Sequence, residues 1–356
     1  MEKNLMKGNE ALAESAIRCG CKCFFGYPIT PQTEISAYMA KRMCKVGGVF
    51  LQAESEIAAI NMVLGAAASG VRAMTSSSSP GISLKSEGIS YIAASDLPCL
   101  IVNVQRGGPG LGGIQPSQSD YWQATKAMGH GDFRILVYSP DSVQEMADYV
   151  SIAFDTAEKY RMPAMILADG LLGQMMEPVA FSEKEYVPIE KPWATNGHGG
   201  KRKHNIINSL MLQPEELYKS NLERFERYKV VESNETRFEN YLLEDADIAV
   251  VAYGATARIA KSAVNSARKK GIKAGLFRPI TLYPFPSEEM NNLIGEKSNV
   301  TQILCTEMNM GQMVDDIKLA VRCSRPVSFF GRTGGIIPTP EEILTEIIRL
   351  SERSAD

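Results

Sequence analysis

Short apolar runs alternate along the chain with longer segments of helical periodicity. Runs rich in Val, Ile, Phe and Leu predict strands, and the alanine-rich or amphipathic segments between them predict helices. In the first half of the chain the expected strands cover residues 22–26, 49–52, 71–75, 99–104, 134–138 and 164–168. The expected helices cover residues 8–20, 31–43, 55–69, 82–95, 117–128 and 141–160. This alternation predicts an α/β domain in which helices cover both faces of a parallel sheet.

Glycine and proline mark the ends of several of these elements. Gly20 and Gly70 each follow a helical segment, where glycine is common because it adopts the left-handed conformation of a C-terminal cap. Thr30 precedes Pro31, and a threonine followed by proline is typical of a helix N-terminus. The sequence therefore predicts a helix that begins at Pro31 and is capped by Thr30.

The alternation stops in the middle of the chain and then resumes. Residues 191–204 are polar and glycine-rich, and residues 214–230 have the pattern of an amphipathic helix. Beyond them the expected strands cover residues 247–253, 273–277, 300–306 and 326–330, and the expected helices cover residues 254–270, 311–322 and 340–351. We therefore expect a first domain over residues 1–185, a linker with a helical arm over 186–240, and a second, smaller α/β domain over 241–356.

Composition and charge narrow the class of protein. With 44% hydrophobic and 22% charged residues, the 356-residue chain can bury a sizeable core. A net charge of −3 without a basic stripe argues against nucleic-acid binding. No apolar run is long enough to cross a bilayer, and the N-terminal residues lack the apolar core of a secretory signal. We therefore expect a cytoplasmic protein that does not bind membranes.

The cysteines do not form a recognisable metal or cluster motif. The chain has seven, and Cys19, Cys21 and Cys23 stand in a Cys-Gly-Cys-Lys-Cys run. That spacing differs from the Cys-x-x-Cys of iron–sulfur and zinc sites, and an odd total argues against a disulfide framework. We expect reduced thiols and no metal site, so any iron–sulfur cluster that accepts electrons would have to lie on another chain.

Chemically capable side chains follow four successive strands. They are Thr30 after the first, Glu54 and Glu56 after the second, Ser76–Ser79 after the third and Arg106 after the fourth. Ligands of open α/β sheets bind beyond the carboxyl ends of the strands, so these residues are predicted to converge. Each also has a purely structural explanation, such as an N-cap for Thr30, a favourable helix dipole for Glu56 or a surface charge for Arg106. Their co-location is what favours a functional site.

Six sequence blocks carry a resemblance to a known family. They are Gly8–Ala11, Tyr27–Pro31, Glu54–Ala59, Gln105–Pro109, Arg278–Pro286 and Glu307–Gln312. Over nearly its whole length the chain resembles the alpha-type (pyrimidine-binding) subunit of 2-oxoacid:ferredoxin oxidoreductases. The Ser76–Gly81 loop is most similar to that of the branched-chain members, which act on 3-methyl-2-oxobutanoate (2-ketoisovalerate). It departs from the threonine-rich loop that is usual in the 2-oxoglutarate members.

The resemblance implies a cofactor and several partners. It implies a thiamine diphosphate pyrimidine-binding domain followed by a domain like the C-terminal domain of transketolase. A beta-type subunit would hold the diphosphate and Mg²⁺ through a Gly-Asp-Gly…Asn motif, and this chain contains no Gly-Asp-Gly. A gamma-type subunit and a ferredoxin-like subunit with iron–sulfur clusters would complete the complex. The implied reaction is oxidative decarboxylation of a 2-oxoacid to acyl-coenzyme A and CO₂, with electrons passed to ferredoxin.

The resemblance also implies roles for single residues. Glu56 would hydrogen-bond the pyrimidine ring nitrogen and so activate the cofactor, and a desolvated carboxyl suits that role. Pro28 would lie near the pyrimidine, and Thr30 and Arg106 would face the substrate carboxylate. Glu54 is the rival of Glu56, but residues two positions apart on a helix point to different faces, so both are not expected to reach the ring.

Three other interpretations remain open at this stage. The chain could be the corresponding subunit of a 2-oxoglutarate:ferredoxin oxidoreductase. It could be a non-catalytic interaction subunit in which the residues at the strand ends are only caps. It could also belong to another thiamine enzyme, of the transketolase kind, which needs no iron–sulfur partner.

Overall fold

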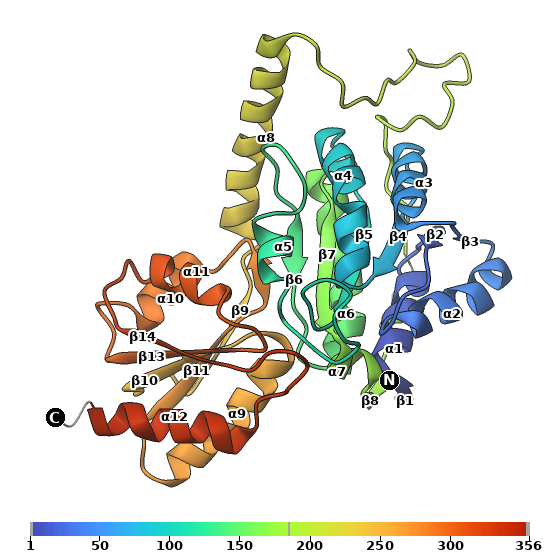
Figure 1. The fold of residues 1–356 in the computed structure, drawn as a ribbon. Coiled ribbons are helices and arrows are strands. Elements are labelled where there is room, and N and C mark those ends of the chain that lie inside the picture. Colours follow the sequence, from blue (N-terminus) through green and yellow to red (C-terminus); the bar gives the residue numbers. More distant parts are fainter. Residues whose placement is uncertain (1–2, 184–185, 354–356) are drawn as a thin grey trace.

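The larger of two main sheets has seven strands in the order β12-β6-β7-β5-β4-β2-β3 (Figure 1). The computed structural model describes residues 3–183 and 186–353. Neighbouring strands run parallel except at β12, which is antiparallel to β6. The strands are β2 (Cys23–Gly26), β3 (Val49–Gln52), β4 (Ala73–Ser77), β5 (Leu100–Gln105), β6 (Leu136–Tyr138), β7 (Ala164–Asp169) and β12 (Thr281–Tyr283). The predicted α/β architecture with a parallel sheet is confirmed.

Helices pack on this sheet in two groups. In one group α1 contacts α2 and α6, and in the other α3 contacts α4. The helices are α1 (Gly8–Arg18), α2 (Thr33–Arg42), α3 (Glu56–Ala68), α4 (Ser79–Ala94) and α6 (Val143–Tyr160). Shorter elements are the 3₁₀ turn η1 (Met43–Val46), α5 (Tyr121–Thr125), α7 (Gly170–Gln174), and the antiparallel pair β1 (Asn4–Lys7) and β8 (Met176–Val179). The strands of this sheet are almost fully buried at β4, β5 and β7, as expected for a sheet covered on both faces.

A second sheet of five strands has the order β14-β13-β10-β11-β9. Its strands are β9 (Phe238–Tyr241), β10 (Ile248–Val251), β11 (Ala274–Pro279), β13 (Gln302–Glu307) and β14 (Val327–Gly331), and only β9 runs antiparallel to its neighbour. Its helices are α9 (Gly254–Lys269), α10 (Ser287–Ile294), α11 (Met313–Ala320) and α12 (Pro340–Arg353). The side chains between α9, α12 and this sheet form a separate apolar core.

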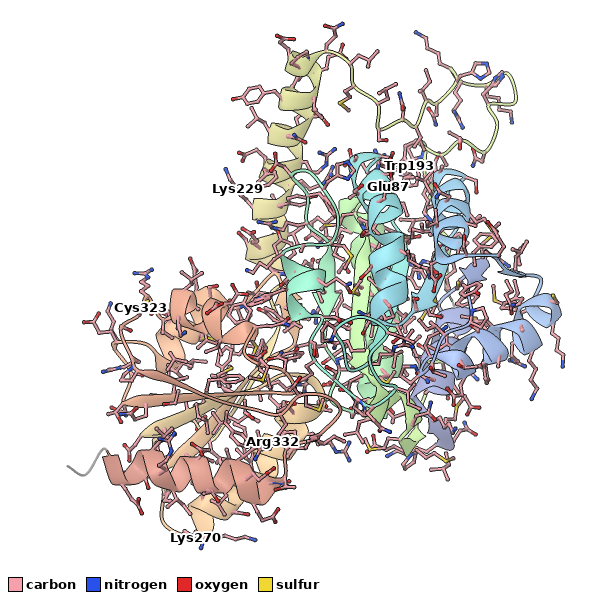
Figure 2. All side chains as sticks on the ribbon, viewed as in Figure 1. Glu87, Trp193, Lys229, Lys270, Cys323 and Arg332 are labelled. Atoms are coloured by element: carbon pink, nitrogen blue, oxygen red, sulfur yellow. The ribbon has the colours of Figure 1, made fainter. Side chains whose placement is uncertain are left out.

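The connection between the sheets includes a long helix, α8 (Pro214–Asn234), after an irregular excursion that Figure 1 shows reaching away from the sheet. One stripe of α8 is anchored, because Tyr228 and Val231 are buried and Arg224 donates to the carbonyl of Ala94 at 3.1 Å. The opposite side carries charged side chains such as Lys229 (Figure 2). The helix expected at 214–230 is therefore present and four residues longer at its C-terminus.

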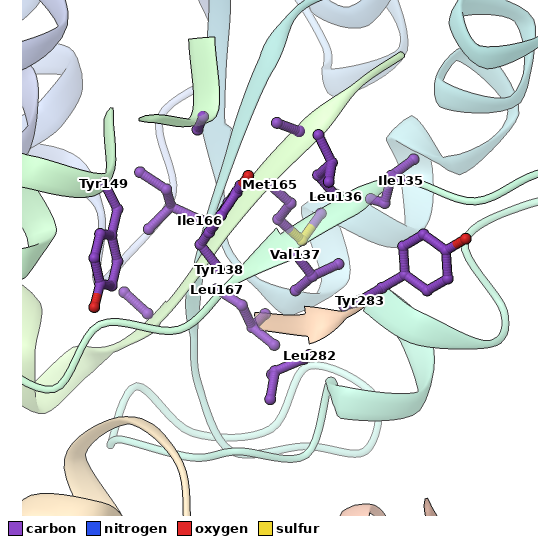
Figure 3. Close-up of a cluster of buried hydrophobic side chains, with 14 of the residues drawn as sticks. Ile135, Leu136, Val137, Tyr138, Tyr149, Met165, Ile166, Leu167, Leu282 and Tyr283 are labelled. Atoms are coloured by element: carbon purple, nitrogen blue, oxygen red, sulfur yellow. The ribbon is translucent and has the colours of Figure 1, made fainter. Parts of the chain in front are cut away.

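Strand β12 belongs to the C-terminal half of the chain but completes the first sheet. Figure 3 shows Leu282 and Tyr283 beside Val137 and Leu167 of the first domain. Leu282 is buried, so the two halves share one apolar core at this edge. No pattern in the sequence predicted this strand, because three residues are too few to show a period of two.

Two expected helices differ from the structure at the strand ends. Helix α2 begins at Thr33 with Gln32 at its N-cap, so the prediction that Thr30 caps it is wrong. The helix expected over residues 117–128 is reduced to α5, because the segment before it is held by bonds to the second domain. Among residues 3–183 and 186–353, no helix is both long and apolar enough to cross a membrane.

The shared core at β12 makes a stability prediction. Leu282→Ala should lower the free energy of unfolding by about 3 kcal/mol, because it leaves a cavity between the two halves. Urea unfolding of the purified chain, followed by circular dichroism, measures this change. Leu319→Ala is the matched control, since Leu319 is 71% exposed and its truncation should change the free energy by less than about 0.5 kcal/mol. Equal losses in the two variants would contradict a shared core.

Candidate active site

Glu56 and Glu54 lie in different environments although they are two residues apart. Ser55 caps α3, and its Oγ accepts from the backbone N–H of Ala58 at 3.2 Å. This cap turns Glu56, the first residue of the helix, toward the interior, where it is 6% exposed. Glu54 precedes the cap and is exposed. The fold therefore buries Glu56 at the carboxyl edge of the sheet and leaves Glu54 in solvent.

The Glu56 carboxyl lies directly over Gly81 in the first turn of α4. A Cβ atom at position 81 would stand 2.7 Å from Glu56 Oε1 and would also collide with Ser77 Oγ. Glycine is needed here because α4 and the carboxyl approach more closely than any side chain allows. A buried carboxyl, a bare helix backbone and the hydroxyl of Ser77 thus meet at one point.

The serine segment is part of the site and does more than cap a helix. Ser76 Oγ donates to Gln32 Oε1 at 2.6 Å, and Ser79 Oγ donates to Asp120 Oδ2 at 2.6 Å. The hydroxyls of Ser77 and Ser78 are buried and have no hydrogen-bond partner among the described residues. Buried polar groups are normally paired, so two unpaired hydroxyls beside Glu56 and Gly81 are unusual.

Asp120 was not singled out in the sequence, yet it organises the loop that carries Arg106. Its Oδ2 accepts from Ser79 and from Asn103 Nδ2, the latter at 2.9 Å. Burial raises the pKa of this carboxyl, and the two hydrogen bonds oppose that rise. The hydroxyl of Ser79 also accepts from the backbone N–H of Arg106 at 3.0 Å. The ends of β4 and β5 are therefore tied together.

Arg106 is buried, so its explanation as a surface charge is wrong. It is 6% exposed, and its Nη1 and Nη2 donate to the carbonyls of Thr30 and Leu111, both at 3.0 Å. Its Nε has no partner in the described part of the chain. The guanidinium thus ties the loop after β2 to the loop after β5. Thr30 and Pro28 are themselves exposed at this edge.

A cavity of about 590 Å³ opens beside Thr30. Its walls come from the loop after β2, the glycine-rich loop, α7 and the second domain, and they are mostly apolar. The lining residues are Thr30, Pro31, Thr33, Glu34, Ile114, Gln115, Pro116, Gly170, Leu171, Gln174, Met175 and Ile337. None of the described residues in this lining is cationic.

Glu34 is the charged group in the wall of this cavity. Burial raises the pKa of its carboxyl, but hydrogen bonds from its own backbone N–H and from Asn9, Gln174 and Lys7 outweigh burial and leave the pKa below its usual value. Glu34 is therefore a carboxylate at neutral pH. Its charge is paired with the Lys7 ammonium at 3.3 Å, so no unpaired cation stands among the described residues of this wall.

The second domain packs against the site at Gly335 and at the hydrogen bonds of Gln118, a residue of the first domain. Gly335 adopts a left-handed φ of 94°, and a Cβ there would collide with Gln115. Gln118 donates through Nε2 to the carbonyl of Tyr253 at 2.8 Å, and its Oε1 accepts from Thr256 Oγ1 at 2.7 Å. These contacts could not be found from sequence, because they join segments more than a hundred residues apart.

Lys85 is a further residue that the sequence analysis missed. It lies on the buried face of α4, one turn after Gly81, and is 0% exposed. A lysine among Ile82 and Ile89 at helical spacing was the available signal, because charged residues are rarely buried without a partner.

Comparisons with known proteins agree with this geometry. A family model described as "Pyruvate flavodoxin/ferredoxin oxidoreductase, thiamine diP-bdg" matches residues 14–241. A second model, "Pyruvate:ferredoxin oxidoreductase core domain II", matches residues 246–343. The two matched ranges together include every strand of both main sheets.

Two relatives match over nearly their full lengths. The chain is 49% identical to a ketoisovalerate oxidoreductase subunit VorB of Methanothermobacter marburgensis over 100% of both chains. It is 35% identical to a 2-oxoglutarate synthase subunit KorA of Methanocaldococcus jannaschii, over 96% of this chain and 98% of that one. The identity to the ketoisovalerate subunit is the higher of the two.

Solved structures give the same result. A 2-oxoglutarate:ferredoxin oxidoreductase of Magnetococcus marinus, with 2-oxoglutarate, coenzyme A and succinyl-CoA bound, superposes with a TM-score of 0.85 at 28% identity. The superposition includes 98% of this chain and 65% of the Magnetococcus marinus chain, so this chain spans just under two thirds of that one. A split-gene transketolase, an inactive tetramer, shares the fold at a TM-score of 0.60 and 13% identity. The family models, the relatives and the fold agree that the chain belongs to the 2-oxoacid:ferredoxin oxidoreductase family.

Proposed function

We propose that this chain is the pyrimidine-side subunit of a complex that oxidatively decarboxylates a branched-chain 2-oxoacid, 3-methyl-2-oxobutanoate, to an acyl-coenzyme A and CO₂. The observation that carries the proposal is the buried Glu56 carboxyl over Gly81 at the carboxyl edge of the sheet. A beta-type subunit would supply the diphosphate and Mg²⁺ half of the site. A gamma-type subunit and a ferredoxin-like subunit with iron–sulfur clusters would carry electrons to ferredoxin.

The residues around Glu56 fit the pyrimidine of thiamine diphosphate. The ring needs one buried carboxyl for its nitrogen and a flat approach to the backbone, and Glu56 and Gly81 provide these. The unpaired buried hydroxyls of Ser77 and Ser78 are further groups that a polar ring can satisfy. When bound, thiamine diphosphate supplies a nucleophilic carbon and a sink for the electrons of the departing carboxylate.

Four residues of the site have assigned tasks in this proposal. Glu56 holds a proton at the pyrimidine nitrogen, and Pro28 borders the ring. Arg106 and Thr30 hold the carboxylate of the substrate, since a guanidinium and a hydroxyl are suited to an anionic oxygen pair. The bonds of Arg106 to Thr30 and Leu111 orient the guanidinium before the substrate arrives.

The cavity beside Thr30 supports an alkyl side chain on the substrate. Its walls contain Ile114, Leu171 and Ile337, and its one charge is the Glu34 carboxylate. An isopropyl group gains from burial against such walls. The second carboxylate of 2-oxoglutarate would lose its hydration there, and the nearby Lys7 ammonium is already paired with Glu34 at 3.3 Å. This favours branched-chain 2-oxoacids over 2-oxoglutarate, which is the alternative substrate.

Glu56→Gln in the assembled complex should lower kcat by about 100-fold or more, because an amide cannot exchange a proton with the ring. Reduction of a viologen dye with 3-methyl-2-oxobutanoate and coenzyme A measures the rate. Glu54→Gln is the matched control, and it should keep the rate of the unmodified complex because Glu54 is exposed. Full activity in Glu56→Gln would contradict the assignment and support a non-catalytic interaction subunit. Activity without any iron–sulfur partner would support a transketolase-like enzyme.

Gly81→Ala should weaken binding of thiamine diphosphate by about tenfold or more, because the added methyl group displaces the Glu56 carboxyl and Ser77. Titration calorimetry on the complex measures the affinity. Gly65→Ala is the control, since a Cβ at Gly65 in α3 meets no atom within 4 Å and alanine favours a helix. Equal affinities in the two variants would mean that the cofactor does not rest on this turn.

Ile114→Lys should raise the kcat/KM for 2-oxoglutarate relative to 3-methyl-2-oxobutanoate by about tenfold, because it adds a cation to the wall of the cavity. Leu111→Lys is the control, because Leu111 lies in the same loop, is 83% exposed and does not line the cavity. The two substrates are compared at saturating coenzyme A. An unchanged ratio in Ile114→Lys would show that the substrate side chain lies elsewhere.

A further inference from the structure

Lys85 is a fully buried lysine to which the proposed reaction gives no task. Its side chain is among the largest that are completely buried, on the face of α4 that packs against the sheet and α3. Burying an ammonium is unfavourable unless nearby groups compensate for its lost hydration. An apolar residue of similar length would pack at this position without that cost, so the charge itself calls for an explanation.

The direct partners of Lys85 are neutral. Its Nζ donates to Thr75 Oγ1 at 2.8 Å and to the carbonyl of Ser76 at 3.0 Å. The hydroxyl of Ser76 in turn donates to Gln32, whose Nε2 donates to the carbonyl of Tyr27 at 3.3 Å. Ser76, which accepts from the ammonium, is therefore linked through Gln32 to the loop that contains Pro28 and Thr30.

The charge that acts on Lys85 is the Glu56 carboxylate. Burial lowers the pKa of Lys85 to about 7, and Glu56 raises it in part. Gly81, over which the Glu56 carboxyl lies, is one helical turn from Lys85 on the same face of α4. The carboxyl and the ammonium thus occupy consecutive turns of one buried helix face.

The elements packed around Lys85 offer it little other charge. Glu56 is the one charged residue in α3, and β4 and β5 have none. Strand β2 contributes a titratable thiol, Cys23, at its opposite end. On α4 itself Glu87 is exposed and accepts from Tyr91 (Figure 2). Asp120, beyond β5, is occupied by Ser79 and Asn103.

We propose that Lys85 is a positioning residue that acts through Glu56, keeping its carboxyl ionised in the buried site and so setting the pH range in which the cofactor pyrimidine is activated. This inference rests on the proposed function of Glu56. The direction of the expected pH shift follows from the positive charge of Lys85. Without the ammonium, the buried site loses the positive charge that favours the ionised carboxyl, so the acid limb of the activity profile moves to higher pH.

The test compares two uncharged variants in the assembled complex. Lys85→Met removes the charge and the hydrogen bonds, whereas Lys85→Gln removes the charge and keeps a donor for Thr75 and Ser76. Two quantities are measured against pH, namely kcat/KM with the 2-oxoacid and the near-ultraviolet circular dichroism of bound thiamine diphosphate without substrate, which reports the protonation of its ring. In both variants the acid-side midpoints should rise by about one pH unit.

Lys126→Met is the matched control, because Lys126 is half exposed and pairs with Asp316, away from Glu56. Its midpoints should equal those of the unmodified complex. Thermal melting should show Lys85→Met to be less stable than the unmodified chain, since it leaves the buried Glu56 carboxylate without a compensating charge and removes the donor to Thr75 and Ser76.

Unchanged midpoints in both Lys85 variants would overturn the inference, and would assign Lys85 to anchoring α4 on β4. If one of the two Lys85 variants does not fold, the other variant alone is compared with the unmodified complex. The unmodified complex separates this failure from failure of the proposed function. If that complex binds no thiamine diphosphate and reduces no viologen with any 2-oxoacid, the proposed function and the inference both fail.

Discussion

The parallel register of β2, β3, β4, β5 and β7 is the constraint on which the rest of this structure depends. It brings the carboxyl ends of all these strands to one edge, and the chain leaves each strand there with polar residues. Loops and the second domain cover part of that edge, so the polar groups cannot all reach water. They must bond to one another, and the loops after the strands are held in place as a result.

The bonds at this edge form one connected set. Arg106 joins the loop after β2 to the loop after β5, and Ser79 and Asp120 join the latter to α4. Lys85 and Ser76 continue the set back to Gln32. These bonds fix the relative positions of the side chains without a ligand, which favours substrate positioning. The unpaired hydroxyls of Ser77 and Ser78 are the exceptions within it.

The junction of the two domains places residues of the second domain in the wall of the cavity beside Thr30. Gln118 bonds to Tyr253, Thr256 and Met308, and β12 extends the first sheet with residues of the second half. Arg278, 2% exposed, pairs with Asp141 and Glu145 across the same junction and with Glu239 of its own sheet. Because buried ion pairs and a shared strand both resist separation of the two domains, Ile337 of the second domain is held at the cavity.

Most of the fold could be predicted from the sequence because its signals are local. Apart from β12, the strands of the first sheet appear as short apolar runs and the main helices as helical periods, and both are properties of neighbouring residues. The rule that ligands bind beyond the strand ends also brought Glu56 and Arg106 into view. Predictions failed where contacts with distant residues determine the structure. Thr30 was expected to cap α2, and Arg106 was open to interpretation as a surface charge.

The sequence by itself therefore determined the order of strands and helices, the family and the set of residues at the edge of the sheet. The tertiary structure alone decided which carboxyl is buried, that Gly81 lies beneath Glu56, that Lys85 shares their helix face, and that β12 and Ile337 cross to the first domain. The physical reason is that burial and pairing depend on groups far apart in the chain. A local pattern sets the direction of a side chain relative to its own element, but not what that side chain meets.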